Sequence, residues 1–495
     1  MKSKLFQVAA ATALTLGLGL AVVMLAFPFR VKAVVGLPVY EMPVSPNGSV
    51  YEVNRDAQGK LWVSDYDAGE IWLLDPAARL YTRYRGFIKP GDARPDGSGS
   101  VWYANGSADY LGQLDVATGA VTLWETAGAG GLYATQVDSD GNIWATSWSN
   151  PLVYRFNPDT KVMCSYALPS LYPSQYLAAN DQGIWLADSN GASIFRLEPD
   201  PNPTLNQYTI WDLPVSSSSW PVGLEPDANG NLWWAEYALG SLHRLEDNPP
   251  GEDDWLTTYV PPVASRPVML DASGSLVRFS DDDTGPIGSL DPSAPTDPPV
   301  KLKTSTQPVT PDCTPPLDPT PADSAKKNSG RMDFTPASYT NLADSAGWKI
   351  WQAPDGGLPY GVRLSGKSVW RADYYRKVMI WEFSGTVVSA CTLADQDGNP
   401  ATTADQTPLE GWRVYLEVDG VRQEPGELTS EAGCYTWLDL DSGHTYAVEE
   451  VLQEGWEALT PVTVDFGAAV EGQLYQNSFI NTVEVDKIYL PLVIR

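Results

Sequence analysis

Histidine, cysteine and basic residues are scarce in this chain of 495 residues. It contains two histidines, His243 and His444, and four cysteines. Neither residue type is clustered and no C-x-x-C pair occurs, so the sequence offers none of the spacings typical of zinc sites. Helical periodicity is also rare, whereas 42 glycines, 41 prolines and 19 tryptophans favour short strands joined by tight turns. The composition predicts an all-β protein.

Acidic residues outnumber basic residues by 61 to 32. Residues 1–33 carry four basic and no acidic residues, so their removal would change the formal net charge from −29 to −33. Such a field repels nucleic acid and anionic lipid, and we expect no nucleic-acid partner. Solubility outside the cell is the simplest explanation of this charge, and cation binding is the sharper alternative.

One long apolar run is present, at the N-terminus. It extends from Leu5 to Phe29 behind Lys2 and Lys4, and small residues near Ala33 suit a signal peptidase. Residues 1–33 are therefore predicted to be a signal peptide of an extracellular or cell-surface protein. The run exceeds the roughly 7–15 residues of a usual signal core, so an uncleaved anchor is the alternative. We expect membrane contact through such an anchor alone.

The four cysteines permit three complete disulfide pairings, and an exported chain meets conditions in which disulfides persist. We expect Cys391 to pair with Cys434, because both lie in the C-terminal region. The partners of Cys164 and Cys313 stay open.

A Trp-containing unit recurs through most of the chain. Its copies are GKLWVSD (59–65), GSVWYAN (99–105), GNIWATS (141–147), QGIWLAD (182–188), GNLWWAE (230–236), GSLVRFS (274–280) and GKSVWRAD (366–373). The first five tryptophans are 40, 42, 41 and 48 residues apart, which matches the roughly 40–50 residues of a four-stranded propeller blade. Seven copies predict a seven-bladed β-propeller over residues 34–384, with the tryptophans packed between blades.

Two segments complete the predicted ring. The orphan strand PVYEMPVS (38–45) precedes the first copy, and we expect it to finish the seventh blade and close the ring. Residues 292–347 break the period and are rich in Pro, Thr, Asp and Ser. They are predicted to be an irregular insertion, either a solvated loop or a lid over one face of the ring.

Equivalent positions on equivalent strands share a depth, so the polar residues that end the copies should gather at one channel mouth. These are Asp65, Asn105, Ser147, Asp188, Glu236, Ser280 and Asp373. The carboxylates Asp65, Asp188, Glu236 and Asp373 are candidate oxygen ligands for calcium or magnesium; the alternative is that these residues cap turns. The aromatic residues just past the strand ends are the candidate ligand-binding residues: Trp148, Tyr237, Tyr374 and Tyr375.

The W-x-x-(D/E) strand end, followed by G-x-L-D-x-x-T-G at Gly112–Gly119, resembles the streptogramin B lyase (virginiamycin B lyase-like) family of seven-bladed propellers over about residues 38–383. The resemblance implies catalytic histidines after a proline at the start of inner strands, with glutamates that hold magnesium. Here those positions carry Val222, Val268 and Tyr360. We therefore expect no catalytic residue of the lyase type, although Glu236 matches the family's W-x-x-E acid.

Residues 385–484 carry six short strands with alternating polarity, which predicts an immunoglobulin-like or prealbumin-like β-sandwich. Their order resembles the SdrD B-like and Cna B-type domains of bacterial surface proteins, which implies a spacer. The first strand, GTVVSACTL, lacks the crosslinking lysine of the Cna B type. The segment DQDGNPATTAD resembles an acidic calcium loop, with Asp395, Asp397, Asn399 and Asp405 as candidate ligands. Residues 485–495 form a short apolar tail.

Two functional hypotheses follow. The first is a non-catalytic extracellular binding or adhesion module, whose partner is a carbohydrate, a peptide or an envelope component. The second is a metal-dependent lyase or lactonase that uses the acidic ring at the channel mouth. A third possibility, a purely structural surface protein, predicts that the insertion blocks this mouth.

Overall fold

A computed structural model describes residues 36–483, except for 43–47, 77, 189–192, 201, 215–218, 249–252, 275, 283–284, 295, 333, 339, 346, 353–358, 366–367, 374–376, 384–385, 404, 430–432, 442 and 471–473. The predicted signal peptide 1–33, the tail 485–495, Tyr374 and Tyr375 lie outside the described residues. The regular secondary structure of the described part consists of β-strands and one 3₁₀ turn at Pro203–Leu205. Within it, no helix has the length and apolarity needed to cross a membrane.

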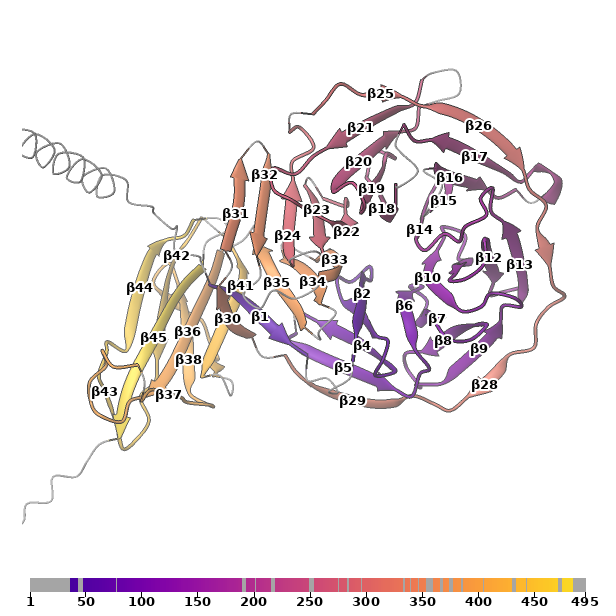
Figure 1. Cartoon of the computed structure of the whole chain (residues 1–495). Helices are drawn as coiled ribbons and strands as arrows, with labels where there is room; N and C mark the ends of the chain where they lie inside the picture. Colours follow the sequence, from indigo (N-terminus) through magenta and orange to yellow (C-terminus); the bar gives the residue numbers. More distant parts are fainter. Residues whose placement is uncertain are drawn as a thin grey trace, which may run out of the picture. The chain divides into compact units, whose positions relative to one another are not determined.

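Seven antiparallel sheets are arranged in a ring, which confirms the seven-bladed propeller (Figure 1). Blade 1 contains β2 (Val50–Arg55), β3 (Leu61–Asp65), β4 (Glu70–Asp75) and β5 (Leu80–Arg85). Blade 2 contains β6 (Pro90–Pro95), β7 (Ser100–Asn105), β8 (Tyr110–Asp115) and β9 (Val121–Glu125). Blade 3 contains β10 (Leu132–Val137), β11 (Ile143–Ser147), β12 (Leu152–Asn157) and β13 (Val162–Ala167).

The remaining four blades follow the same order from the inside outward. Blade 4 contains β14 (Leu177–Asn180), β15 (Gly183–Ala187), β16 (Ser193–Glu198) and β17 (Gln207–Asp212). Blade 5 contains β18 (Pro221–Pro226), β19 (Leu232–Glu236), β20 (Ser241–Glu246) and β21 (Trp255–Tyr259). Blade 6 contains β22 (Pro267–Asp271), β23 (Val277–Asp281), β24 (Pro286–Leu290) and β32 (Trp348–Gln352). Blade 7 contains β33 (Pro359–Ser365), β34 (Ser368–Asp373), β35 (Lys377–Phe383) and β1 (Gly36–Glu41).

The N-terminal strand closes the ring, as the sequence predicts. β1 pairs antiparallel with β35 of blade 7, with Val39 opposite Met379 and Glu41 opposite Lys377. The seventh sheet is therefore built from both ends of the propeller sequence, which joins the last blade to the first.

The repeated tryptophans lie between blades and are at most 3% exposed. In the first five copies the indole N–H donates to an Asp or Asn five or six residues earlier, as Trp102 does to Asp96 at 3.1 Å and Trp144 to Asp138 at 2.7 Å. Asp96 also accepts from the backbone N–H of Ser98 at 2.8 Å. The hydrogen bond thus joins the hairpin turn to the indole side chain that is buried between two blades. It also gives a partner to the indole N–H, the one polar group of the tryptophan side chain.

The segment 292–347 differs from its predicted irregular form. It contains seven short strands, each of which adds a fifth strand to the outer edge of a blade. They are β25 (Val300–Lys301), β26 (Lys303–Pro308), β27 (Asp312–Cys313), β28 (Thr320–Ala322), β29 (Lys326–Arg331), β30 (Phe334–Ser338) and β31 (Thr340–Ser345). We call residues 300–345 the belt.

The belt leaves blade 6 after β24, visits blades 5, 4, 3, 2, 1 and 7 in turn, and returns to blade 6 through β31 and β32. Figure 1 shows it along the outer rim of the ring. The lid prediction is therefore wrong for the described strands. The outer edge of each blade offers unpaired main-chain groups, and a polar segment can form a strand by pairing with them. Such pairing does not require that apolar and polar side chains alternate along the strand.

A disulfide joins the belt to the propeller. Cys313 of β27 lies opposite Cys164 of β13, and the two sulfur atoms are bonded. The predicted Cys391–Cys434 disulfide is also present, between β36 and β41. Two disulfides fit an oxidising compartment, in agreement with the predicted export of the chain.

The C-terminal strands form two sheets with a shared apolar core, which confirms the predicted sandwich. One sheet contains β36 (Thr386–Ala394), β37 (Thr407–Pro408), β41 (Cys434–Leu440), β43 (Trp456–Ala458) and β45 (Leu474–Val483). The other contains β38 (Arg413–Val418), β39 (Val421–Arg422), β40 (Glu427–Leu428), β42 (Thr445–Glu450) and β44 (Thr463–Ala468). Val388, Val414, Val448 and Phe479 are fully buried between them.

Candidate ligand-binding site

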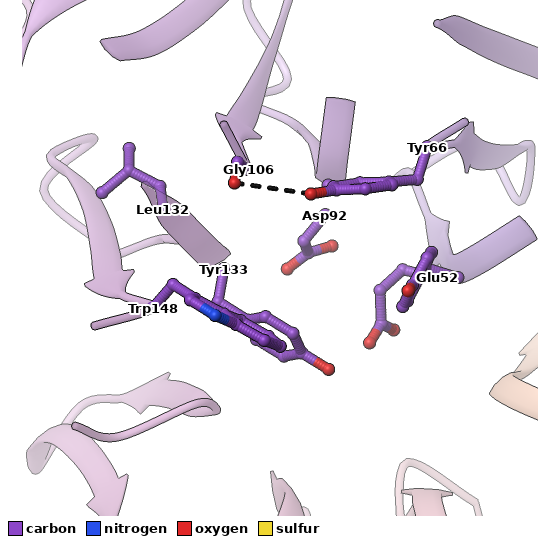
Figure 2. Close-up of a pocket in the computed structure, with 9 residues that line it drawn as sticks. Glu52, Tyr66, Asp92, Gly106, Leu132, Tyr133 and Trp148 are labelled. Carbon is purple, nitrogen blue, oxygen red and sulfur yellow. Dashed lines mark hydrogen bonds between the residues drawn. The ribbon is translucent and has the colours of Figure 1, made fainter. Parts of the chain in front are cut away.

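A pocket of about 210 Å³ lies where the inner strands of blades 1, 2 and 3 meet. We call it the inner-strand pocket, and its residues are Tyr51, Glu52, Tyr66, Gly91, Asp92, Gly106, Leu132, Tyr133 and Trp148 (Figure 2). The three blades contribute in the same way. Each supplies residues from its inner strand, β2, β6 or β10, and the first residue after its second strand, β3, β7 or β11. The propeller repeat therefore generates the pocket.

Aromatic rings form two walls of the pocket. On blade 3 the rings of Tyr133 and Trp148 pack with centroids 4.9 Å apart, and the Tyr133 hydroxyl lies 3.1 Å from that of Tyr176. On blade 1 the rings of Tyr51 and Tyr66 lie 5.2 Å apart. Figure 2 shows Tyr66 on one side of the pocket and the Tyr133–Trp148 pair on the other. A ligand between them would meet ring faces from two blades.

A glycine fixes the position of the Tyr66 ring. The Tyr66 hydroxyl donates to the carbonyl of Gly106 at 3.4 Å. A Cβ atom at position 106 would lie 2.4 Å from the Tyr66 ring, closer than side-chain contacts allow. Any larger residue at position 106 would therefore displace one wall of the pocket.

Two carboxylates, from Asp92 and Glu52, point into the space between these walls (Figure 2). Asp92, on β6, is held by several donors. It accepts from the backbone N–H of Thr135 and from Nε of Arg94, each at 3.1 Å, and from the side-chain amide of Asn54. These contacts tie together blades 1, 2 and 3, so Asp92 is a fixed negative charge beneath the aromatic walls.

Glu52, on β2, is not held in this way. Its side chain is 6% exposed, and its Oε2 atom is buried without a hydrogen-bond partner among the described residues. Burial raises the pKa of Glu52 to about 8, and the nearby charge of Asp92 adds to this, while Arg363 and Arg94 act in the opposite direction. Glu52 is therefore a buried acceptor with unused capacity for a hydrogen bond or a charge.

Deeper in the ring, Glu225 of β18 lies 3.5 Å from the Arg363 guanidinium of β33. Burial raises the pKa of Glu225, whereas the charge of Arg363 opposes the shift. Arg363 also donates to the carbonyl of Leu270 at 2.9 Å. The inner strands of several blades thus enclose a network of partly compensated charge.

The carboxylates of the predicted acidic ring do not line the inner-strand pocket. Asp65 is fully buried and accepts from the backbone N–H groups of Ser49 at 2.7 Å and Ala68 at 3.1 Å. Glu236 accepts from the Ser219 hydroxyl at 2.7 Å and from a backbone N–H. Asp65 thus binds neighbouring backbone through its Oδ1 atom, and Glu236 binds the segment before β18 through both carboxylate oxygens.

Among the described residues, the carboxylates of the ring form no group of three with converging ligand atoms. Asp188 is buried at the end of β15, and the side chain of Asp373 lies outside the described part of the chain. In blade 6 the equivalent residue is Asp281 and not Ser280, because Asp281 lies opposite Pro267 as Glu236 lies opposite Pro221. The predicted ring member in that blade is therefore wrong by one residue.

The predicted aromatic residues have different environments. Trp148 is 48% exposed and lines the inner-strand pocket. Tyr237 occupies the equivalent position in blade 5, where its hydroxyl donates to Asp282 at 2.9 Å and its ring packs on Trp220. Sequence reasoning missed Tyr66, which follows Asp65 as Trp148 follows Ser147; alignment of that position across the copies would have identified it.

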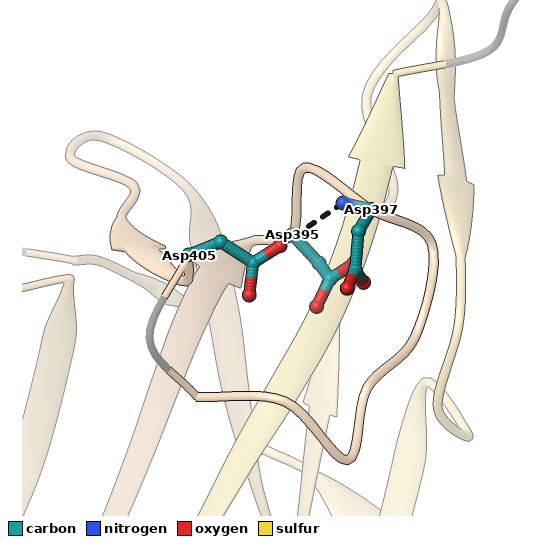
Figure 3. A group of neighbouring side chains, drawn as sticks. All are labelled: Asp395, Asp397 and Asp405. Carbon is teal, nitrogen blue, oxygen red and sulfur yellow. Dashed lines mark hydrogen bonds between the residues drawn. The ribbon is translucent and has the colours of Figure 1, made fainter.

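The C-terminal sandwich contains the one group of converging carboxylates found among the described residues. Ligand atoms of Asp395, Asp397 and Asp405 lie within 4.8 Å of one another (Figure 3). Asp395 is 3% exposed, and its Oδ1 atom has no hydrogen-bond partner in the described part. The side-chain oxygen of Asn399, the fourth predicted ligand, accepts from the N–H of Ala401 at 3.2 Å.

Neither histidine lines the inner-strand pocket. His243 is buried in blade 5, stacked on Trp234 and 2.9 Å from the Ser241 hydroxyl. Burial lowers the pKa of His243 to about 4. Val222 and Val268, which replace the histidines of the family pattern, are buried on inner strands β18 and β22.

The ring of seven sheets and the pocket at its inner strands define this protein as a β-propeller with a candidate small-ligand site. Residues 37–291 match the virginiamycin B lyase family, and the chain belongs to that family. The expected family resemblance is thereby confirmed for the propeller.

Solved structures with a similar fold include lyases of this family. A catalytically inactive virginiamycin B lyase from Staphylococcus aureus, solved with quinupristin, is 17% identical, with 69% of this chain and 97% of that chain covered and a TM-score of 0.49. A streptogramin B lyase structure is 18% identical, with 69% and 95% covered and a TM-score of 0.49. Regucalcin from Agrobacterium tumefaciens, a calcium-binding protein, is 16% identical, with 50% and 85% covered and a TM-score of 0.36. A search of curated proteins finds no match.

Proposed function

We propose that this chain is an exported binding module whose propeller holds a small ligand, free or part of a carbohydrate, peptide or envelope component, in the inner-strand pocket. The observation that carries the proposal is the pairing of aromatic walls from blades 1 and 3 with the carboxylates of Glu52 and Asp92. Apolar walls with a few convergent polar groups are the usual composition of a ligand site. The repeat supplies this composition on a rigid scaffold.

A binding role is favoured over metal-dependent catalysis by the same residues. A lyase or lactonase that uses the acidic ring would need several carboxylate oxygens free to bind magnesium or calcium. Asp65 instead accepts hydrogen bonds from Ser49 and Ala68, and Glu236 accepts them from Ser219 and Trp220. The position of the belt on the rim also argues against a purely structural protein with a blocked mouth.

Trp148 offers a direct test of the binding proposal. We would screen the full-length chain by calorimetry against neutral, anionic and cationic small molecules, glycans and peptides, with Trp148→Ala and Trp220→Ala as matched variants. Trp220 is an exposed tryptophan in blade 5 outside the pocket. We expect at least one ligand whose binding is lost in Trp148→Ala and kept in Trp220→Ala. Equal binding by both variants, or no ligand at all, contradicts the proposal.

For the C-terminal sandwich we propose a spacer of the SdrD B-like or Cna B type that attaches the propeller to the cell envelope. The Cys391–Cys434 disulfide links the first strand, β36, to β41. In the chain-entropy model a bridge with a sequence separation of 43 contributes about 4 kcal/mol of stability. Such a bridge could take the place of the lysine crosslink that the first strand lacks.

We also propose that Asp395, Asp397 and Asp405 bind calcium. Carboxylate oxygens are the ligands that calcium prefers, and Asp395 presents a buried oxygen without a partner. Calcium should raise the Tm of the full-length chain, whereas the chelator EDTA should lower it. Asp405→Asn should remove this effect and Asn399→Ala should retain it. A Tm that calcium leaves unchanged, or that magnesium raises equally, overturns the assignment.

A further inference from the structure

We propose that the inner-strand pocket selects a small organic cation, an ammonium or quaternary ammonium group held between the aromatic walls above Glu52 and Asp92. This inference rests on the binding function proposed above and specifies its ligand class. Four observations carry it: the ring faces, the unpartnered carboxylate, the balance of charge and the size of the pocket.

The walls present the kind of surface that attracts cations. The faces of Tyr and Trp rings carry partial negative charge, and a cation within about 6 Å of a ring centroid is attracted to them. Lys89 already lies 5.0 Å from the Tyr66 centroid, so this ring accepts a cation in the present structure. Trp148 and Tyr133 provide a second, partly exposed surface on the opposite side.

Glu52 supplies the acceptor. Its Oε2 atom is buried without a hydrogen-bond partner among the described residues, and its carboxylate points into the pocket. Other buried polar atoms of the described residues also lack a partner, but among the residues that line this pocket only Glu52 has such an atom. A ligand N–H donor or positive charge would satisfy it, whereas an anionic ligand would face repulsion from Glu52 and Asp92.

The local balance of charge favours a cation when Glu52 is ionised. The charged groups that act on Glu52 or Glu225 include the carboxylates of Asp92 and Asp271 and the guanidinium groups of Arg55, Arg94 and Arg363. With Glu52 and Glu225 themselves, four carboxylates thus face three guanidinium groups. Protonated Glu52 leaves three carboxylates against three guanidinium groups, whereas ionised Glu52 leaves one negative charge that a bound cation would neutralise.

The pocket fits an organic cation better than a metal ion. Calcium and magnesium need several oxygen ligands around one point, and the converging acidic group found among the described residues lies in the sandwich and not in this pocket. The cavity of about 210 Å³ is smaller than the roughly 300–1,000 Å³ of pockets for drug-sized ligands. It therefore suits a compact head group.

Proton release should accompany binding. Glu52, with its pKa raised to about 8, is mostly protonated at pH 7. Asp92 and Glu225 favour this protonated form, while Arg363 and Arg94 favour the ionised form. A bound cation also favours the ionised carboxylate, so binding should release a proton near pH 7 and tighten as pH rises from 6.5 to 8.5.

The experiment compares two probes of equal shape and different charge. Choline and its neutral isostere 3,3-dimethyl-1-butanol would be titrated into the full-length chain by calorimetry, in two buffers of different ionisation enthalpy. We expect choline to bind at least tenfold more tightly and to release a proton. Glu52→Gln should weaken choline binding about tenfold and abolish the proton release, and Trp148→Ala should weaken it about three- to tenfold. Trp220→Ala should leave it unchanged.

Each outcome separates the two proposals. Equal affinity for the charged and neutral probes overturns the cation inference and needs no variant to be folded. Trp148-dependent binding of neutral or anionic molecules alone also overturns it, yet leaves the general binding function standing. If neither choline nor its isostere binds, the cation inference falls, whereas the general binding function falls only if the wider screen also finds no ligand. A peptide with one trimethyllysine, tested beside its unmodified form, distinguishes a free cation from one presented on a polypeptide.

Discussion

Cys313 of the belt is bonded to Cys164 in the outermost repeat strand of blade 3, 149 residues earlier in the chain. This is the one disulfide between the belt and the blades among the described residues. All eight residues of β26 and β27, such as Thr304 and Thr306, are exposed and contribute nothing to an apolar core. Main-chain pairing and this bridge therefore hold the segment in place.

The bridge should be a major source of stability. In the chain-entropy model a closed loop of this length contributes about 5 kcal/mol, so Cys164→Ser with Cys313→Ser should lower the free energy of unfolding by up to that amount. Urea unfolding followed by tryptophan fluorescence measures it. The Cys391→Ser, Cys434→Ser pair is the comparison. Unchanged stability and unchanged protease resistance of residues 300–345 would show that strand pairing alone retains the belt.

Gly106 should control the shape of the pocket. A methyl group at this position would overlap the Tyr66 ring, so Gly106→Ala should displace that wall, destabilise the fold by about 1–3 kcal/mol through overpacking and weaken ligand binding. Gly443→Ala is a suitable control, because a Cβ atom there meets nothing within 4 Å. Wild-type affinity in Gly106→Ala would show that Tyr66 is dispensable for binding.

The two histidines should have pKa values on opposite sides of the usual histidine value. Burial lowers the pKa of His243 to about 4. The hydrogen bond to Asp419 at 2.6 Å, together with the negative charge of this residue, raises the pKa of His444. NMR of histidine-labelled protein should therefore show one imidazole neutral at pH 5.5 and the other charged. Asp419→Asn should move only the second curve, downward. Two coincident curves would contradict the burial of His243.

Glu450 should make the sandwich less stable at high pH. Burial raises the pKa of Glu450 to about 7, although Asn481 donates to it at 3.0 Å. The folded state thus binds the proton more tightly than the unfolded state, so stability falls as pH rises from about 4.5 to 7 and then levels off. Glu450→Gln should stabilise the protein on the order of 1–2 kcal/mol at pH 8 and little at pH 4.5. Thermal unfolding at both values measures this.

The exposed carboxylate Glu457 on β43 provides the control for that experiment. Glu457→Gln should have the same small effect at both pH values. A gain in stability of Glu450→Gln that is equal at pH 4.5 and pH 8 would show that titration of Glu450 is not its cause.

The sequence predicts the blades well because their packing repeats. The turn Asp, the Gly and the Trp recur at fixed spacing, and the structure shows why: the Asp side chain receives both turn amides and the indole N–H. Closure by β1 was predictable for a related reason, since one strand was missing at one end and one was left over at the other. The error at Ser280 arose where blade 6 carries no such Trp.

The belt and the pocket depend on information that is not local. Strands such as β29 are exposed and polar, and they form because open blade edges are available, so no periodic pattern marks them. Likewise, nothing adjacent to Glu52 in the sequence shows that its carboxylate is buried beside Asp92, 40 residues later. Trp148 was identifiable from its place after a repeat, whereas its partner carboxylates required the closed ring.

The position of β1 has a mechanical consequence. This strand lies between β35 on one side and β30 of the belt on the other. A pull on its N-terminal end would load two antiparallel ladders at once, in shear, instead of peeling away a single edge strand. If residues 1–33 tether the chain to a cell, tension on that tether would act on β1, the strand that closes the ring and is paired on both edges.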